Sequence, residues 1–271
     1  MRVLVANARM YSPDVVSAAA WRALLQWVAK RSGIALELID HPSPLPLATL
    51  WARADLGCAF MCGYPFARTR PQPRLLAAPV PSPKRYGGIP VYWTEFVVRA
   101  DSPLRSIDDA FGRRMAYTTE MSQSGYQAPR RFLAPCARAR GGSLFASTVG
   151  PLVTPRNVAA AIVSGEADVG PLDSYALDLL RKHERELTAQ LRTIASTPPT
   201  PMPPLVAAPA IDAGVARRLS ESLHAVGDAD ELASVRDDLL LDRFVAADPR
   251  SYDELLSRAD EADRLGYARL A

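Results

Sequence analysis

The stretch VLVANARMYSPDVVSAAAWRALLQWVAKRSG, residues 3–33, decides the fold class of this chain. Its apolar start, residues 3–8, is typical of a buried β-strand. Ser12 is the expected N-cap of the helix that follows, and Gly33 is expected to end that helix. A strand that runs directly into a long helix is the first half of a βαβ unit, so the stretch predicts a parallel sheet covered by helices.

The same alternation continues along the chain and then restarts. After residue 33 we expect a strand, a short helix and another strand, at 34–40, 48–54 and 55–61. A stretch rich in Pro and Gly leads into an apolar strand at 91–99, and strands and helices alternate again up to about residue 190. The sequence therefore predicts an α/β fold of two lobes, each a mainly parallel sheet flanked by helices.

Two crossings between the lobes are expected, near 91–99 and 191–207, because both stretches follow or contain many prolines. They divide the chain into lobe one, residues 1–95 and 195–271, and an inserted lobe two, residues 96–194. The return segment is expected to be helical near 212–227, 229–241 and 251–265.

Composition excludes several classes of function. The chain has 271 residues, of which 48% are hydrophobic and 23% charged, enough for proper cores. The net charge is only +3, and basic residues are spread among acids, which argues against a nucleic-acid partner. No apolar run reaches the roughly 18 residues of a membrane span. The three cysteines form no CxxC pair, and the absence of metal-ligand spacings and nucleotide motifs predicts neither metal nor cofactor.

The turn SQSGY, residues 122–126, is the first candidate for a binding site. It follows a predicted strand and opens a helix, and ligands of open α/β sheets bind beyond the carboxyl ends of strands. Unpaired amides and a partial positive charge make a helix N-terminus suited to an anion. One helix needs only one cap, so one of the two hydroxyls, those of Ser122 and Ser124, is left for a ligand. A serine nucleophile is not expected, because the glycine of a nucleophile elbow is missing.

Other polar side chains are expected at the same edges. Thr154 could be an ordinary N-cap or an anion donor, and Asp173 could cap the next helix, accept a hydrogen bond from a ligand, or do both. Tyr64, Tyr92, Trp93 and Tyr175 fit a binding site and a core equally well, and Tyr11 is a further candidate because it follows the first strand.

The order of these motifs resembles the periplasmic phosphate, phosphite and phosphonate substrate-binding proteins of ABC transporters, which have the type II periplasmic-binding-protein fold. The resemblance rests on DLGCAFMCGYPF (55–66), VYWTEFVVRADSPLRSIDDAFGRRMAY (91–117), SQSGY and TPRNVAAAIVSGEADVGPLD (154–173).

This resemblance implies a set of ligand-binding residues. The serine turn would hold the oxyanion, two tyrosines would complete the pocket, and an acidic residue stands where many family members have one. Where such proteins usually carry Gly-Ser-His, this chain reads Thr-Pro-Arg, so Arg156 would replace a histidine and could bind an oxyanion through two hydrogen bonds. The predicted set is Ser122, Gln123, Ser124, Gly125, Tyr64, Tyr92, Arg156, Asp173, Thr154 and Tyr11.

The expected function is capture of a small oxyanion in a cleft between hinged lobes, in the periplasm, for uptake through an ABC permease and without catalysis. Two alternatives stay open. One is an enzyme on the same fold that acts on a small carboxylate with Asp173 or Glu120 as proton acceptor. The other is a cytosolic anion sensor, because the chain as given begins directly with its first strand and shows no export signal.

Overall fold

The computed structural model describes residues 3–271, which divide into two compact units. Unit 1 consists of residues 3–91 and Pro201–Tyr252, and unit 2 of Tyr92–Thr200 and Asp253–Ala271. The first two passages of the chain between the units fall where the sequence predicts crossings, and the strands β5 (Val91–Tyr92) and β11 (Thr200–Pro201) pair there. A third passage follows Tyr252, which the sequence analysis does not predict.

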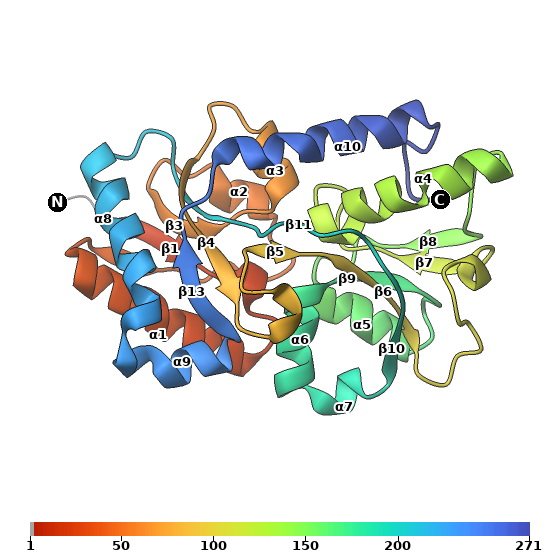
Figure 1. Cartoon of the computed structure of the whole chain (residues 1–271), viewed down its shortest axis with the longest axis horizontal. Coiled ribbons are helices and arrows are strands. Elements are labelled where there is room, and N and C mark those ends of the chain that lie inside the picture. Colours follow the sequence, from red (N-terminus) through yellow and green to blue (C-terminus); the bar gives the residue numbers. More distant parts are fainter. Residues whose placement is uncertain (1–2) are drawn as a thin grey trace. The chain divides into compact units, whose positions relative to one another are not determined.

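The C-terminal segment was expected in lobe one but belongs to unit 2. Its helix α10 (Asp253–Arg264) lies beside α4 (Ala128–Arg140), as Figure 1 shows. The buried Arg130 of α4 forms an ion pair with Asp263, and Leu270 is buried in the core of unit 2. The amphipathic pattern of the segment predicts a helix, but it carries no information on which unit receives the apolar face.

Unit 1 is built on a six-stranded sheet in the order β13-β4-β12-β3-β1-β2. β1 is parallel to β2 and β3, whereas β12 and β13 pair antiparallel with their neighbours, so the sheet is mixed. Two strands correct the expectations, because β4 lies within the stretch rich in Pro and Gly that precedes the first crossing, and β13 follows a segment expected to be helical. The strands are β1 (Leu4–Asn7), β2 (Leu36–Leu38), β3 (Leu56–Phe60), β4 (Arg74–Pro81), β12 (Leu205–Ala207) and β13 (Leu241–Val245).

The first helix, α1 (Val15–Ser32), ends before Gly33 as predicted, but its N-cap is Asp14, two residues later than the expected Ser12. The carboxylate of Asp14 accepts a hydrogen bond from the amide of Ser17 at 2.8 Å. The hydroxyl of Ser12, the predicted cap, instead donates to a backbone carbonyl of the preceding loop. Aspartate and serine cap equally well, so sequence alone does not separate them.

The other helices of unit 1 cover its sheet, and Phe60 lies in the core between the rings of Tyr11 and Trp21. Burial raises the pKa of the Cys58 thiol to about 12, which makes this cysteine chemically inert. These helices are α2 (Leu47–Trp51), α3 (Gly63–Arg68), α8 (Ala213–His224) and α9 (Ala233–Asp238).

Unit 2 contains a sheet whose strands follow the order β10-β6-β9, with β7 and β8 continuing beyond β9. β6 is antiparallel to both of its neighbours, whereas β7 is parallel to β8 and, through the bridge between Met115 and Val169, to β9. Between β6 and β7 the chain forms only a short 3-10 turn, Asp108–Ala110, in place of a full helix of the alternating pattern. The strands are β6 (Thr94–Arg99), β7 (Arg114–Ala116), β8 (Ser147–Val149), β9 (Gly170–Asp173) and β10 (Leu191–Ser196).

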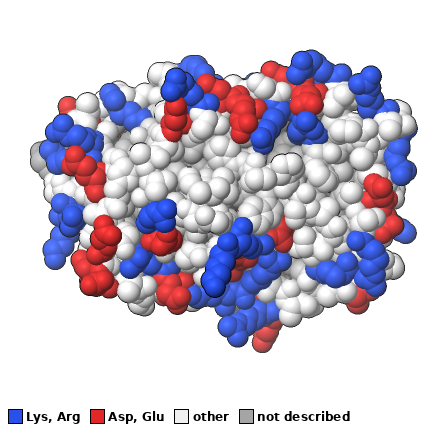
Figure 2. Space-filling model, viewed as in Figure 1, with Lys and Arg blue, Asp and Glu red and all other residues white. Residues whose placement is uncertain are grey.

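Helices α4, α5 (Pro155–Val163), α6 (Ser174–His183) and α7 (Arg185–Thr188) pack around this sheet (Figure 1). Within residues 3–271, no helix combines the length and the hydrophobicity needed to cross a bilayer. The same residues contain no cluster of three or more His, Cys, Asp or Glu side chains suited to a metal ion. Figure 2 shows basic and acidic side chains next to one another over most of the face in view, with one group of basic side chains at its lower middle.

Candidate functional site

Three loops with polar residues meet at one edge of the unit 2 sheet. Because β7, β8 and β9 are parallel, their carboxyl ends point to the same edge. The turn that starts at Ser122 follows β7, Thr154 follows β8, and Asp173 ends β9; each is the N-cap of the next segment. The predicted clustering of helix starts beyond the strands is therefore present in this unit.

The serine turn has one capping residue, Ser122. Its hydroxyl accepts a hydrogen bond from the amide of Gly125 at 2.9 Å, and its carbonyl accepts one from the amide of Gln127 at 3.0 Å. The second bond spans five residues, so Gln123–Gln127 is a wide, π-helical turn that continues into α4. Such turns occur frequently at functional sites. Ser124 is not needed as a cap.

Ser124 lies against Asp173, and both side chains are buried. The Ser124 hydroxyl is 3.5 Å from Oδ2 of Asp173, while its carbonyl accepts a hydrogen bond from the hydroxyl of Thr94 at 2.8 Å. The other carboxylate oxygen, Oδ1, accepts hydrogen bonds from the amides of Tyr175 and Ala176 at 2.9 and 3.0 Å. Asp173 therefore caps α6 with one oxygen, as one of the predicted roles requires, and turns the other toward Ser124. Its second role, accepting a hydrogen bond from a ligand, stays a prediction.

Gly125 allows the turn to approach the end of β7. A Cβ atom at this position would lie 1.9 Å from the hydroxyl oxygen of Thr118. The Thr118 hydroxyl and the side-chain oxygen of Gln123 are buried and have no hydrogen-bond partner among the described residues. An unpartnered buried polar atom is costly unless a ligand or water satisfies it. Thr118 was missed in the sequence analysis, although its place at the end of a predicted strand is a usable signal.

Two other predicted ligand residues have local partners. The Thr154 hydroxyl accepts a hydrogen bond from the amide of Asn157 at 3.1 Å, as an ordinary N-cap does. Arg156 donates from Nε to both carboxylate oxygens of Glu184, at 2.8 and 3.0 Å, and this carboxylate raises the pKa of the guanidinium. Glu184 follows the C-terminal end of α6, which has 10 residues and is about 15 Å long, whereas Asp173 caps its start. The structure does not bring Arg156 next to Asp173.

The three tyrosines of the predicted set are buried, Tyr11 and Tyr64 in unit 1 and Tyr92 in unit 2. Tyr92 of unit 2 accepts a hydrogen bond at its carbonyl from the hydroxyl of Thr200, at 3.4 Å. In unit 1, Tyr11 has the position of a core residue, since its ring packs edge-on against a phenylalanine at 5.0 Å. The hydroxyl of Tyr64, at the start of α3, accepts a hydrogen bond from Arg68 at 3.1 Å. Their contribution to a ligand site stays a prediction.

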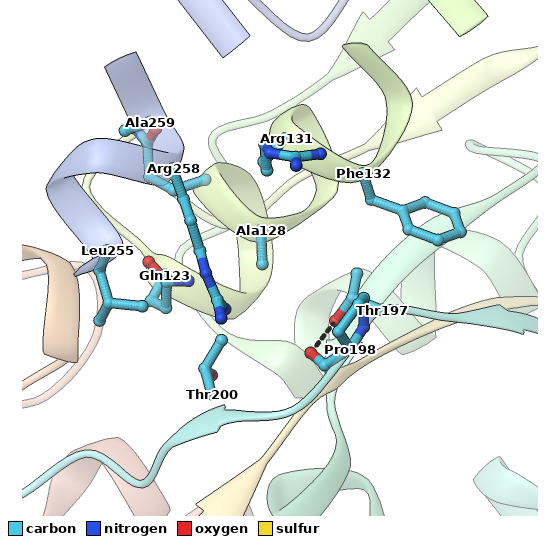
Figure 3. A pocket seen from close by; sticks show the side chains of 11 residues that line it. Gln123, Ala128, Arg131, Phe132, Thr197, Pro198, Thr200, Leu255, Arg258 and Ala259 are labelled. Carbon is cyan, nitrogen blue, oxygen red and sulfur yellow. Dashed lines mark hydrogen bonds between the residues drawn. The ribbon is translucent and has the colours of Figure 1, made fainter. Parts of the chain in front are cut away.

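A pocket of about 210 Å³ lies beside the serine turn, between the start of α4, the helix α10 and residues 197–200. In Figure 3 the guanidinium of Arg258 points into this space, toward Gln123 and Thr200. Arg258 pairs with Glu254 at 3.2 Å, and the neighbouring Arg131 also has a carboxylate partner. The positive charge at this pocket is therefore largely balanced.

Residues 8–252 match the family described as ABC transporter, phosphonate, periplasmic substrate-binding protein. The chain belongs to this family. The match includes the serine turn, Asp173 and the other predicted ligand residues, and it confirms the resemblance inferred from the motifs. The protein is thus a substrate-binding protein of the phosphonate ABC-transporter family, and the interpretation as a solute-binding protein is confirmed over the alternative of a fold-related enzyme.

Solved structures confirm the two-lobed α/β fold of this phosphonate-binding family member. A binding protein component of an ABC phosphonate transporter from Pseudomonas aeruginosa has a TM-score of 0.83 at 18% identity, covering 97% of this chain and 87% of that one. PhnD1 from Prochlorococcus marinus in complex with methylphosphonate has a TM-score of 0.79 at 18% identity, covering 97% and 98%. A Xanthomonas citri protein bound to ATP has a TM-score of 0.68 at 22% identity, covering 98% of each chain. No curated protein matches the chain.

Proposed function

We propose that the protein binds a phosphonate or a related small oxyanion at the serine turn of unit 2, in the periplasm, and delivers it unchanged to an ABC permease. The observation that carries this proposal is the arrangement around Ser124. Its hydroxyl is not used as a helix cap, and the Thr118 hydroxyl, without a hydrogen-bond partner among the described residues, lies beneath the same turn.

The turn offers the donors that an oxyanion requires. The amides of Gln123 and Ser124 precede that of Gln127, the first amide that donates to a carbonyl of the turn, so the helix itself provides no partner for them. The partial positive charge at the start of α4 adds to their attraction for an anion. The hydroxyls of Ser124 and Thr118 can rotate to donate to ligand oxygens. A site of neutral donors suits reversible capture.

Asp173 gives the same site one acceptor. A carboxylate oxygen beside an anion site repels a fully ionised ligand, but it accepts a hydrogen bond from a protonated ligand oxygen or an amine. This supports a phosphonate or phosphate over a sulfonate. The rival proton acceptor for catalysis, Glu120, is exposed on the loop before the turn. We therefore propose binding without a chemical step.

A thermal-shift screen tests this function. We expect methylphosphonate, 2-aminoethylphosphonate, phosphite or phosphate to raise the melting temperature, because a ligand at 100 times its Kd adds about 2.7 kcal/mol to the free energy of unfolding. Sulfate, taurine and dicarboxylates are the comparison ligands. A shift with dicarboxylates or cations, and none with any phosphorus oxyanion, would contradict the proposal.

Replacing Ser124 by Ala is expected to raise the Kd of the bound oxyanion roughly tenfold, since one hydrogen bond to a charged group contributes about 1.5 kcal/mol. Isothermal titration calorimetry measures the effect. Thr154→Ala is the matched control, because that hydroxyl only caps α5. It should lower the unfolding free energy by about 1 kcal/mol and leave the Kd unchanged. Equal Kd values for the Ser124 variant and the wild type would reduce Ser124 to a structural residue.

A further inference from the structure

Gln127, the last residue of the wide turn, holds the loop in front of it. Its backbone amide donates to the carbonyl of Ser122 at 3.0 Å, and its side-chain amide donates to the carbonyl of Glu120 at 2.7 Å. The same side chain accepts a hydrogen bond at Oε1 from Arg130, at 2.8 Å. Gln127 thereby fixes the backbone on which Ser122 and Ser124 depend, and Arg130 fixes the orientation of its amide.

The guanidinium of Arg130 connects this turn to the C-terminal segment, Asp253–Ala271. It is buried, forms an ion pair with Asp263, and donates to the carbonyls of Ala259 at 3.1 Å and Ala268 at 2.9 Å. Of its hydrogen-bond partners among the described residues, only Gln127 lies outside that segment. The planar, multiply bonded guanidinium has little freedom to rotate, so it transmits the position of α10 to Gln127.

A pocket separates part of α10 from the start of α4, beside Gln123. At this place close packing between the two helices cannot position the turn, so the hydrogen bonds through Arg130 must do so. Gln123, Ala128 and Ala259 line the pocket, and Figure 3 shows them on its walls, so α10 does not fill the space next to the start of α4. On the side that faces the pocket, the turn therefore depends on the surrounding hydrogen bonds for its precise geometry. Here these bonds run from α10 through Arg130 to Gln127.

We propose that Arg130 and Gln127 are positioning residues through which the C-terminal segment sets the ligand affinity of the serine turn. This inference rests on the oxyanion-binding function proposed for that turn. The segment that supplies Asp263 and the two carbonyls lies beyond the residues matched to the family, 8–252. The inference that α10 supports the turn therefore rests on the hydrogen bonds of this chain and not on the family match.

Matched variants of the two ion pairs between α4 and α10 test the proposal. Asp263→Asn weakens the anchor of Arg130, whereas Arg131→Gln removes the pair between Arg131 and Glu261, which does not reach Gln127. Gln127→Met keeps the side-chain length but removes both side-chain hydrogen bonds. We expect the Kd for methylphosphonate to rise about tenfold in Gln127→Met and several-fold in Asp263→Asn, and to stay unchanged in Arg131→Gln.

Hydrogen exchange of the amides at 119–126 provides a readout independent of the ligand. Exchange should accelerate in Gln127→Met and Asp263→Asn but not in Arg131→Gln, even if the two ion-pair variants lose similar thermal stability. Wild-type Kd and exchange in a folded Gln127→Met variant would overturn the proposal, as would an equal Kd change in Arg131→Gln. If the wild type binds no oxyanion, the proposed function fails, while the exchange pattern still decides whether α10 holds the turn.

Discussion

Replacing Gly125 by Ala should raise the Kd of the oxyanion at least about a hundredfold, a loss of about 2.7 kcal/mol. The added Cβ would lie 1.9 Å from the hydroxyl oxygen of Thr118, 2.9 Å from its Cβ and 3.0 Å from the hydroxyl oxygen of Ser122. Thr118 is buried at the end of β7 and is stiff at its first side-chain torsion, so it cannot move aside cheaply. The turn must shift, and the shift displaces both the cap at Ser122 and the hydroxyl of Ser124.

The effect on folding should be smaller than the effect on binding, because overpacking typically costs about 1 to 3 kcal/mol and a loop can relax part of it. Gly141→Ala is the matched control at the other end of α4. Gly141 has a φ of 81° and open space around its Cβ position, so the substitution strains the helix end without touching the site. Calorimetry and thermal melts of both variants separate the two effects. Wild-type affinity in Gly125→Ala would show that the close approach to Thr118 does not shape the ligand site.

The parts of the fold that the sequence predicts correctly are those with local signals. The first strand follows from an apolar run, and the end of α1 follows from Gly33, which has a φ of 66°. In unit 2, β9 and α6 follow from an apolar strand that ends in a capping aspartate. These signals lie within a few residues of the element that they define, so no knowledge of distant partners is needed.

The errors concern partners that are distant in the sequence. β4 contains Pro79 and Pro81, which read as chain breakers, yet the strand is accommodated between β12 and β13 in antiparallel pairing. β13 follows a short helix, and its strand character depends on pairing with β4. The third passage between the units arises in the same way, because α10 is held by Arg130, more than a hundred residues earlier.

In the candidate site, too, the residues with local signals could be predicted, and those that depend on distant partners could not. Ser122 and Asp173 could be placed from the sequence, because helix starts after parallel strands gather at one edge. Thr118 and Gln127 could not, since their roles arise from the close approach of the turn to β7 and α10. Arg156 was predicted as a ligand residue because it stands where family members usually have a histidine, and no local pattern indicates its pairing with Glu184.

Replacing Asp173 by Asn should reverse the preference of the site among oxyanions. Asparagine can keep the cap of α6, because its carbonyl oxygen can accept the hydrogen bonds from Tyr175 and Ala176 that Oδ1 accepts now. The group beside Ser124 changes from an anionic acceptor to a neutral amide that can donate. We therefore expect a folded variant with weaker methylphosphonate binding and stronger methanesulfonate binding.

The size of this effect follows from the hydrogen bond that is lost. The carboxylate repels both monoanions alike, whereas only the protonated phosphonate donates a hydrogen bond to it, and such a bond to a charged group contributes about 1.5 to 3 kcal/mol, so the ratio of the two Kd values should change by about tenfold to a hundredfold. Glu120→Gln is the matched control, because this carboxylate is exposed on the loop before the turn. The ratio of the Kd values for methylphosphonate and methanesulfonate in this variant should equal that of the wild type.

The pH dependence of the Kd for methylphosphonate provides a second test of the role of Asp173. As pH rises, a phosphonate loses its last proton and can no longer donate to Asp173, so wild-type affinity for methylphosphonate should fall through that titration. The Asn variant has no carboxylate to repel the dianion and should lose less affinity over the same range. If the Asn variant keeps both the wild-type Kd ratio and the wild-type pH profile, Asp173 acts only as the cap of α6, and the selectivity for a protonated oxyanion must arise from other residues.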